Sequence, residues 1–185
     1  MKLIKQNLGA LGDGGAIVSN RKSIAKKALK LRQYGWSKKY MISIPGGRNS
    51  RLDEIQASFL SNLLLNLDKL NKKRRVIANF YSRMIKNKNI IAPKQQTTNF
   101  VAHQYVIRTS KRNSLIKWLN KSNIDSVIHY PIPDHKQNIL QKNYSKIVLA
   151  NTEKLSRQVL SIPCHPYLKS EEVNKILKVL NSWRK

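Results

Sequence analysis

Short apolar segments alternate with amphipathic ones along the second half of this chain, and this alternation most constrains its fold. Residues 101–109 alternate apolar and polar side chains, which predicts a strand. The sequence then predicts a helix, a strand, a helix, a strand and a last helix, over residues 114–122, 126–130, 152–158, 159–162 and 170–180. Strands that alternate with helices favour packing of helices on a sheet, so the predicted fold class is α/β.

Two predicted helices dominate the part of the chain before Pro93. Between residues 52 and 67, apolar side chains recur at three- and four-residue steps, on one face of a helix for which Asn49 or Ser50 is the expected N-cap. A second helix is predicted over about residues 70–85. Upstream of both, the sequence predicts a glycine-rich turn, a short strand, a helix and a loop, over residues 8–15, 16–18, 21–34 and 36–50.

The chain is strongly basic, with 36 Lys and Arg against 9 Asp and Glu and a formal net charge of +27. Such a charge attracts phosphate backbones, so nonspecific nucleic-acid binding is expected. The basic residues are scattered along the chain, however, and no zinc-finger spacing or aromatic RNA-binding signature accompanies them. The dense cluster at residues 72–75 lies on a predicted helix, where a solvated face is the favoured interpretation.

The cysteine and histidine content favours neither a disulfide scaffold nor a metal centre. Cys164 is the only cysteine and is interpreted as a buried thiol. His129 and His135 are separated by two prolines, which set no fixed geometry for a metal, so both are interpreted as packed or hydrogen-bonded loop histidines. His103 precedes a predicted strand and has no partner nearby in the sequence. No metal site is predicted.

Hydropathy indicates a soluble, folded protein. The hydrophobic content of 41% is too high for a disordered chain. No window approaches the run of about 20 apolar residues that a membrane-spanning helix needs, and the first residues lack the apolar core of a signal peptide. A cytoplasmic location is therefore expected.

Four segments, in this order, resemble motifs of the DegT/DnrJ/EryC1/StrS family. Residues 49–57 are similar to the family's G-x-N-x-R-[LM]-D-E-[IL]-Q-A helix start, and residues 127–133 to its I-H-Y-P-x-P loop. Residues 160–166 are similar to its L-S-[IL]-P-x-x-P turn, and residues 7–16 to the segment that follows its cofactor lysine. Members of this family are pyridoxal-phosphate-dependent aminotransferases that act on the keto sugars of nucleotide-sugar pathways, which supply polysaccharide and lipopolysaccharide biosynthesis.

The resemblance implies the C-terminal portion of a type I aminotransferase fold, that is, the end of the large cofactor-binding domain and the small C-terminal α/β domain. Residues 1–66 would be a remnant of the large domain, and residues 67–185 the small domain. The chain is accordingly expected to be a truncated family member.

The resemblance also implies positions for the site residues. The family places its Schiff-base lysine immediately before Asn-Leu-Gly, where this chain has Gln6, with Lys5 adjacent. A carboxamide cannot form an imine, so no catalytic residue is intact at this position. Asn49 matches the family asparagine that reaches the cofactor phosphate of a neighbouring subunit. His129 and Tyr130 are implied to face the sugar nucleotide.

Three hypotheses follow from these residues. The first is a truncated aminotransferase derivative that is inactive alone and does not bind pyridoxal phosphate by itself. Its expected partner, if it has one, is a second copy in a homodimer. The second is one half of a split enzyme, completed by a chain that supplies the N-terminal half. The third is a basic nucleic-acid-binding or scaffolding protein that reuses the small domain.

Overall fold

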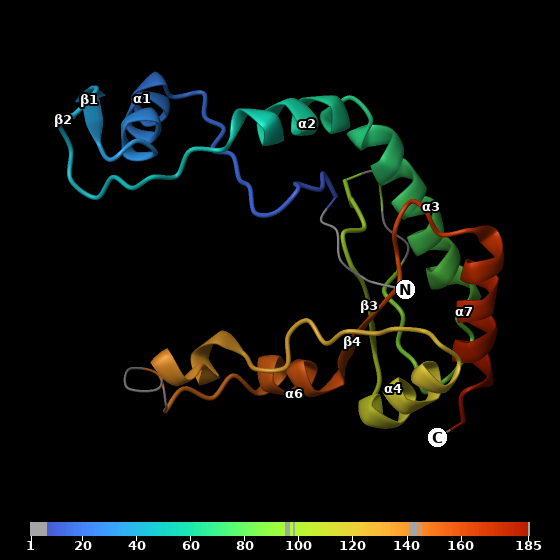
Figure 1. Cartoon of the computed structure of the whole chain (residues 1–185). Helices are drawn as coiled ribbons and strands as arrows, with labels where there is room; N and C mark the ends of the chain where they lie inside the picture. The colour runs from blue at the N-terminus through green and yellow to red at the C-terminus, as the bar shows by residue number, and fades with distance from the viewer. Residues whose placement is uncertain (1–6, 95–96, 98, 141–143, 145, 185) are drawn as a thin grey trace. The chain divides into compact units, whose positions relative to one another are not determined.

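A computed structural model describes residues 7–94, 97, 99–140, 144 and 146–184. The chain divides into two compact units (Figure 1). One unit is Leu8–Asn66, and the other begins at Leu67 and includes Asn7. That the two units are a large-domain remnant and a small domain stays a prediction. No helix in the described part of the chain is long and apolar enough to cross a membrane.

A small antiparallel sheet lies at the centre of the C-terminal unit. Strand β3 (Tyr105–Arg108) pairs with β4 (Val159–Ile162), in a register that sets Tyr105 opposite Ile162. Single bridges extend the sheet at both edges, from Ile91 to Arg108 and from Val127 to Ser161. The alternating side chains of β3 place Tyr105 and Ile107 in the core, as its sequence pattern predicts.

Three of the helices described in this unit contribute buried residues to its core. They are α3 (Leu67–Met84), α4 (Arg112–Lys121) and α7 (Ser170–Ser182), and α7 contacts both of the others (Figure 1). The backbone N–H of Lys169 donates to the Glu172 carboxylate at 2.8 Å, which fixes the start of α7. The buried apolar residues form one core cluster, which includes Tyr81, Leu115, Leu119, Leu160, Ile162, Ile176, Leu180 and Trp183.

A long excursion connects the edge of the sheet to β4. It contains the 3-10 turns η1 (Asp134–Lys136) and η2 (Asn138–Leu140) and then helix α6 (Ala150–Gln158). The predicted strand over residues 126–130 is wrong except for its single bridge at Val127, because Pro131 and Pro133 carry the chain away from the sheet.

The N-terminal unit contains α1 (Lys22–Leu31), the hairpin of β1 (Trp36–Lys38) and β2 (Met41–Ile42), and α2 (Glu54–Leu64). Among its described residues, only Gly35 is buried. Gly35 has a φ of +78°, and a Cβ atom on it would collide with the Ile44 carbonyl. A Cβ on Gly47 would collide with the backbone of Tyr34 and Gly35, so these glycines let two chain segments cross.

Three predictions for the N-terminal unit are wrong. Residues 16–18 belong to none of the described strands, and Ile17 and Val18 are exposed without a neighbouring strand to accept their backbone hydrogen bonds. The predicted loop at 36–50 contains the β1–β2 hairpin. The N-cap of α2 is Asp53 rather than Asn49 or Ser50, because the chain stays extended until that residue.

Candidate functional site

The two predicted sugar-side residues lie where the chain leaves the sheet edge. Nδ1 of His129 lies 2.9 Å from the Ser161 hydroxyl on β4, so the imidazole is attached to the sheet as a hydrogen-bonded loop histidine. Tyr130 is 71% exposed, and its ring stands edge-on to that of His129 with centroids 5.4 Å apart. The peptide bond between these residues is cis. Tyr130 is thus the more accessible of the pair.

The same unit contains a buried cation. Arg74, on α3, is only 4% exposed and donates from Nη1 to the carbonyl oxygen of Cys164 at 2.9 Å. The solvated-face interpretation of residues 72–75 is therefore wrong for Arg74, although Lys72 and Lys73 are exposed. One turn of a helix has both an inner and an outer face, and a cluster of four consecutive basic residues spans both.

Arg74 acts on two histidines of the same unit. Burial, and then the Arg74 charge, lower the pKa of His103 and of His165 below the ordinary value of 6.5. His129 lowers the pKa of His103 further. Neutral imidazoles are therefore the favoured form at pH 7 at both positions.

His103 has a partner that the sequence did not reveal. Its Nδ1 lies 3.1 Å from Oδ1 of Asn7, a residue 96 positions away in the chain. Asn7 in turn donates from Nδ2 to Oδ1 of Asn71 at 2.8 Å and to the carbonyl oxygen of Val101 at 3.0 Å. In the sequence, Asn7 is marked only by its place directly after position 6, which the resemblance assigns to the family's lysine. No pattern in the sequence indicates that His103 is its partner.

Gln6 and Lys5 lie outside the described residues. The resemblance assigns position 6 to the family's Schiff-base lysine, and a carboxamide there provides no amine for covalent attachment of the cofactor aldehyde. That the chain holds no covalently bound cofactor stays a prediction.

Asn49 lies in the N-terminal unit, on an exposed segment that bridges to Gln33. Its Oδ1 accepts a hydrogen bond from Nε of Arg51 at 3.1 Å. This contact directs the amide nitrogen away from Arg51, where it is a suitable donor to a phosphate oxygen. The role in cofactor binding stays a prediction.

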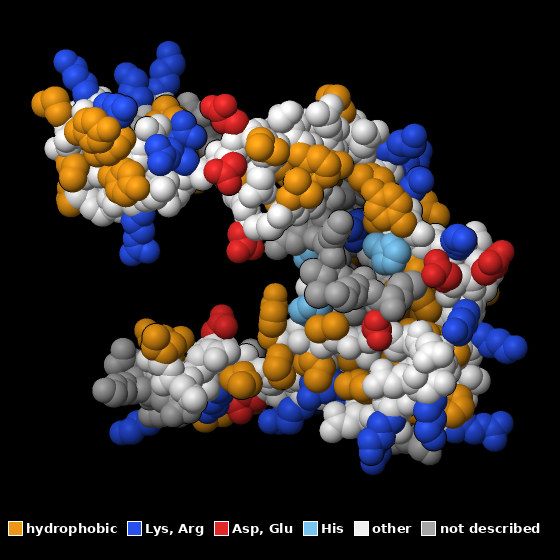
Figure 2. All heavy atoms as spheres, viewed as in Figure 1, with side chains coloured by type: hydrophobic (Ala, Val, Ile, Leu, Met, Phe, Trp, Pro, Cys, Tyr) orange, Lys and Arg blue, Asp and Glu red, His pale blue; other side chains and the backbone are white. Residues whose placement is uncertain are grey.

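Lys and Arg are concentrated around this segment without acidic residues between them. Residues 14–52 contain ten Lys and Arg residues and no Asp or Glu. In Figure 2, basic and hydrophobic side chains lie together over α1 and the β1–β2 hairpin. Lys39 lies over the Tyr40 ring at 5.1 Å, and the rings of Tyr34, Trp36 and Tyr40 follow one another at 5.2 and 5.4 Å.

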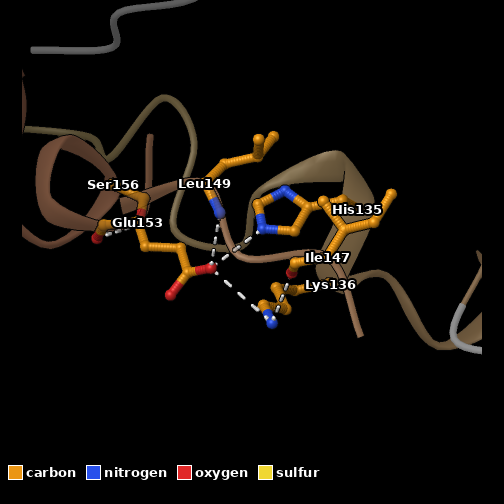
Figure 3. Close-up of polar contacts among 6 residues, drawn as sticks. All are labelled: His135, Lys136, Ile147, Leu149, Glu153 and Ser156. Carbon is orange, nitrogen blue, oxygen red and sulfur yellow. Dashed lines mark hydrogen bonds and ion pairs between the residues drawn. The ribbon is translucent and has the colours of Figure 1, made fainter. Parts of the chain in front are cut away.

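His135 is a hydrogen-bonded histidine, as expected. It is buried, and its Nε2 lies 3.1 Å from Oε1 of Glu153 on α6 (Figure 3). The same oxygen accepts from the Leu149 backbone N–H at 3.3 Å and lies 3.6 Å from Nζ of Lys136. The described residues contain no group of three or more His, Cys, Asp and Glu side chains that could hold a metal ion.

Cys164 is a buried thiol, as predicted. Burial raises its pKa to about 12, although the Arg74 charge acts in the opposite direction. A thiol with so high a pKa is a poor nucleophile at neutral pH. Cys164 is therefore not a catalytic candidate.

Comparison with known proteins identifies the family. A profile of the DegT/DnrJ/EryC1/StrS aminotransferase family matches residues 4–181. The dTDP-3-amino-3,6-dideoxy-alpha-D-galactopyranose transaminase of Aneurinibacillus thermoaerophilus is 40% identical, over 92% of this chain and 47% of that protein. The "pleiotropic regulatory protein" of Geobacillus stearothermophilus is 35% identical, over 94% of this chain and 48% of that protein.

Solved structures of related enzymes match as well. The crystal structure of Streptomyces venezuelae DesV with a ketimine intermediate has a TM-score of 0.90 and 33% identity, over 96% of this chain and 48% of that one. Bacillus subtilis NtdA with bound cofactor PMP has a TM-score of 0.85 and 26% identity, over 94% and 42%. The chain spans about half the length of these relatives. It belongs to the DegT/DnrJ/EryC1/StrS aminotransferase family.

Proposed function

We propose that these 185 residues form the C-terminal half of a pyridoxal-phosphate-dependent nucleotide-sugar aminotransferase and do not transfer amino groups by themselves. The observation that carries the proposal is Gln6. By resemblance this is the family's lysine position, and a carboxamide can neither form an imine nor accept the substrate proton as a base.

The relatives support the substrate class. The Aneurinibacillus enzyme is a transaminase for a dTDP-linked amino sugar, and the Bacillus NtdA structure contains the aminated cofactor. Asn49, with an exposed amide donor, supports the role that the resemblance assigns, toward the cofactor phosphate of a neighbouring subunit that holds the cofactor. Tyr130, exposed at the sheet edge, is the better placed of the two sugar-side residues for ligand contact.

The proposal is tested by cofactor titration of the purified chain. Absorbance is recorded against pyridoxal phosphate, the mixture is reduced with borohydride, and labelled lysines are located by mass spectrometry. We expect weak labelling of many surface lysines and no saturable site. Streptomyces venezuelae DesV is the positive control. A stoichiometric adduct on Lys5, lost in Lys5→Arg, would overturn the proposal.

A split enzyme is a second candidate, favoured by the surface of the N-terminal unit. Ile17, Val18, Ile55 and Leu65 are each more than 75% exposed. A unit of 59 residues, Leu8–Asn66, with one buried residue among those described cannot gain much hydrophobic stabilisation by itself. A chain carrying the N-terminal half of the family fold would cover such a surface.

Co-expression tests this alternative. The N-terminal half of the Aneurinibacillus relative is produced together with this chain, and co-purification is measured. Ile55→Glu places a charge on the exposed apolar face of α2 and should abolish co-purification, whereas Lys72→Gln, on α3, changes the net charge by the same single unit and is the control. Co-purification that is unaffected by Ile55→Glu, or absent in both cases, would argue against a split enzyme.

A further inference from the structure

The side-chain amide of Asn7 has a fixed orientation. Its nitrogen lies 3.0 Å from the Val101 carbonyl oxygen, which can only accept a hydrogen bond. A flipped amide would set two acceptors against each other there. The nitrogen also donates to Oδ1 of Asn71 at 2.8 Å, so both of its hydrogens are used.

The fixed amide determines the state of His103. Because the Asn7 nitrogen faces Val101 and Asn71, its oxygen is the atom that faces Nδ1 of His103, at 3.1 Å. An amide oxygen is an acceptor only, so Nδ1 must carry the proton for this bond to exist. In a neutral ring the lone pair then lies on Nε2.

The surroundings of His103 keep that lone pair available. Burial, Arg74 and His129 all lower the pKa of His103, so the ring is neutral at pH 7. The residue is nevertheless exposed, and the only described hydrogen bond of its ring is the one to Asn7. Nε2 is thus open to a ligand or to another side chain.

We propose that Asn7 is a positioning residue that holds His103 in the Nδ1–H tautomer, so that Nε2 of His103 is a fixed proton acceptor for a bound ligand. The C-terminal unit of this chain therefore keeps a preformed acceptor. This inference does not depend on the proposed function, because it uses only the contacts of Asn7 and His103.

The tautomer is measured directly by ¹H–¹⁵N correlation spectra of the imidazole rings in the ¹⁵N-labelled chain at pH 7.5. We expect the Nδ1–H pattern for His103, although free imidazole side chains favour Nε2–H. In Asn7→Ala the Nδ1–H pattern should be lost. In Asn7→Asp it should be retained, because a carboxylate oxygen still accepts from Nδ1, at some cost in stability because the other oxygen then faces the Val101 carbonyl. A purely structural role would make both variants behave alike.

His165 is the internal control, because Arg74 also acts on it but no described hydrogen bond joins it to Asn7. Its spectrum should be the same in all three chains. If a variant does not fold, the unaltered chain still decides: an Nε2–H pattern for His103 would overturn the proposal, as would an Nδ1–H pattern that survives in folded Asn7→Ala.

None of these measurements involves the cofactor, so the result is independent of the pyridoxal phosphate titration.

Discussion

Arg74 shows how one residue of a basic cluster can be structural. It is buried against Cys164, whereas its neighbour Lys73 is exposed. Arg74→Ala removes a charge-assisted hydrogen bond and the packing of the aliphatic stem, and should cost about 2–4 kcal/mol of unfolding free energy. Lys73→Ala is the matched control and should change it by less than ~0.5 kcal/mol. Urea denaturation compares them, and equal effects would contradict the assignment of Arg74 to the interior.

Glu153 gives the fold a defined response to acid. The hydrogen bond with His135 is the main cause that holds the pKa of Glu153 below its ordinary value of 4.5, and the Leu149 N–H and Lys136 act in the same direction. A carboxylate with a lowered folded-state pKa stabilises the fold above its unfolded-state pKa, and this stabilisation is lost as pH falls through the folded-state pKa.

Glu153→Gln should therefore lower the thermal midpoint at pH 7 and flatten its decrease between about pH 5 and 3. Thermal denaturation across this pH range measures the effect. Glu171→Gln, which removes an exposed carboxylate from α7, should leave the slope almost unchanged. If the thermal midpoint of the Glu153→Gln chain fell with pH as steeply as that of the unaltered chain, Glu153 would not be the origin of this pH dependence.

At the scale of elements, Gly35 and Gly47 let two chain segments cross, and this crossing positions the segment that carries Asn49. A Cβ on Gly47 has no space beside the backbone of Tyr34 and Gly35. Gly47→Ala should therefore separate the two segments, at a cost of about 1–3 kcal/mol, and increase trypsin cleavage at nearby sites such as Lys38 and Arg51 several-fold. Gly15→Ala, where a Cβ meets nothing within 4 Å, is the control. Equal cleavage of both variants would show that the crossing is not formed in solution.

The elements that sequence reasoning found are those whose residue pattern is complete within the element itself. Residues 159–162 form β4 as predicted, and the acidic first turn at Glu171 and Glu172 marks the start of α7. Residues 16–18 have the apolar character of a strand, but a strand also needs a neighbour. The β1–β2 hairpin was missed because its strands have only three and two residues and carry no alternation.

The site was predictable only where a family motif or a local pattern marked it. Position 6, Asn49, His129 and Tyr130 came from resemblance, and the loop character of His135 from the prolines around it. The hydrogen bond between His103 and Asn7 spans 96 residues, and neither residue type indicates the other. Such a contact depends on tertiary packing that no local pattern encodes.

At the scale of the whole molecule, charge and burial are distributed differently. The acid-free stretch at 14–52 should dominate nonspecific binding to duplex DNA. We expect weak affinity that falls steeply with added salt and does not depend on sequence, and a marked loss when Lys26, Lys27, Lys38 and Lys39 are changed to Gln. Fluorescence anisotropy with two unrelated duplexes measures this. A preference for one duplex that persists at high salt would support the nucleic-acid-binding alternative.

Burial of side chains, by contrast, is observed in the C-terminal unit. Among the described residues, every buried side chain belongs to this unit, and Gly35 is the one buried residue outside it. Hydrophobic burial is the main source of folding free energy, so the unit from Leu67 onward should account for nearly all the stability of the chain. The N-terminal unit adds exposed apolar side chains and, in β1 and β2, unpaired strand edges that favour association.

A fragment of residues 67–185 should consequently be more soluble than the full chain and unfold cooperatively at nearly the same temperature. Light scattering during concentration and thermal denaturation by circular dichroism provide the two measurements. The reciprocal fragment, residues 8–66, should show no cooperative transition, because it lacks a core. If the full chain proved the more soluble, or if 67–185 unfolded far below it, residues 8–66 would be contributing to the stability of the second unit, and the boundary at Asn66 would be wrong.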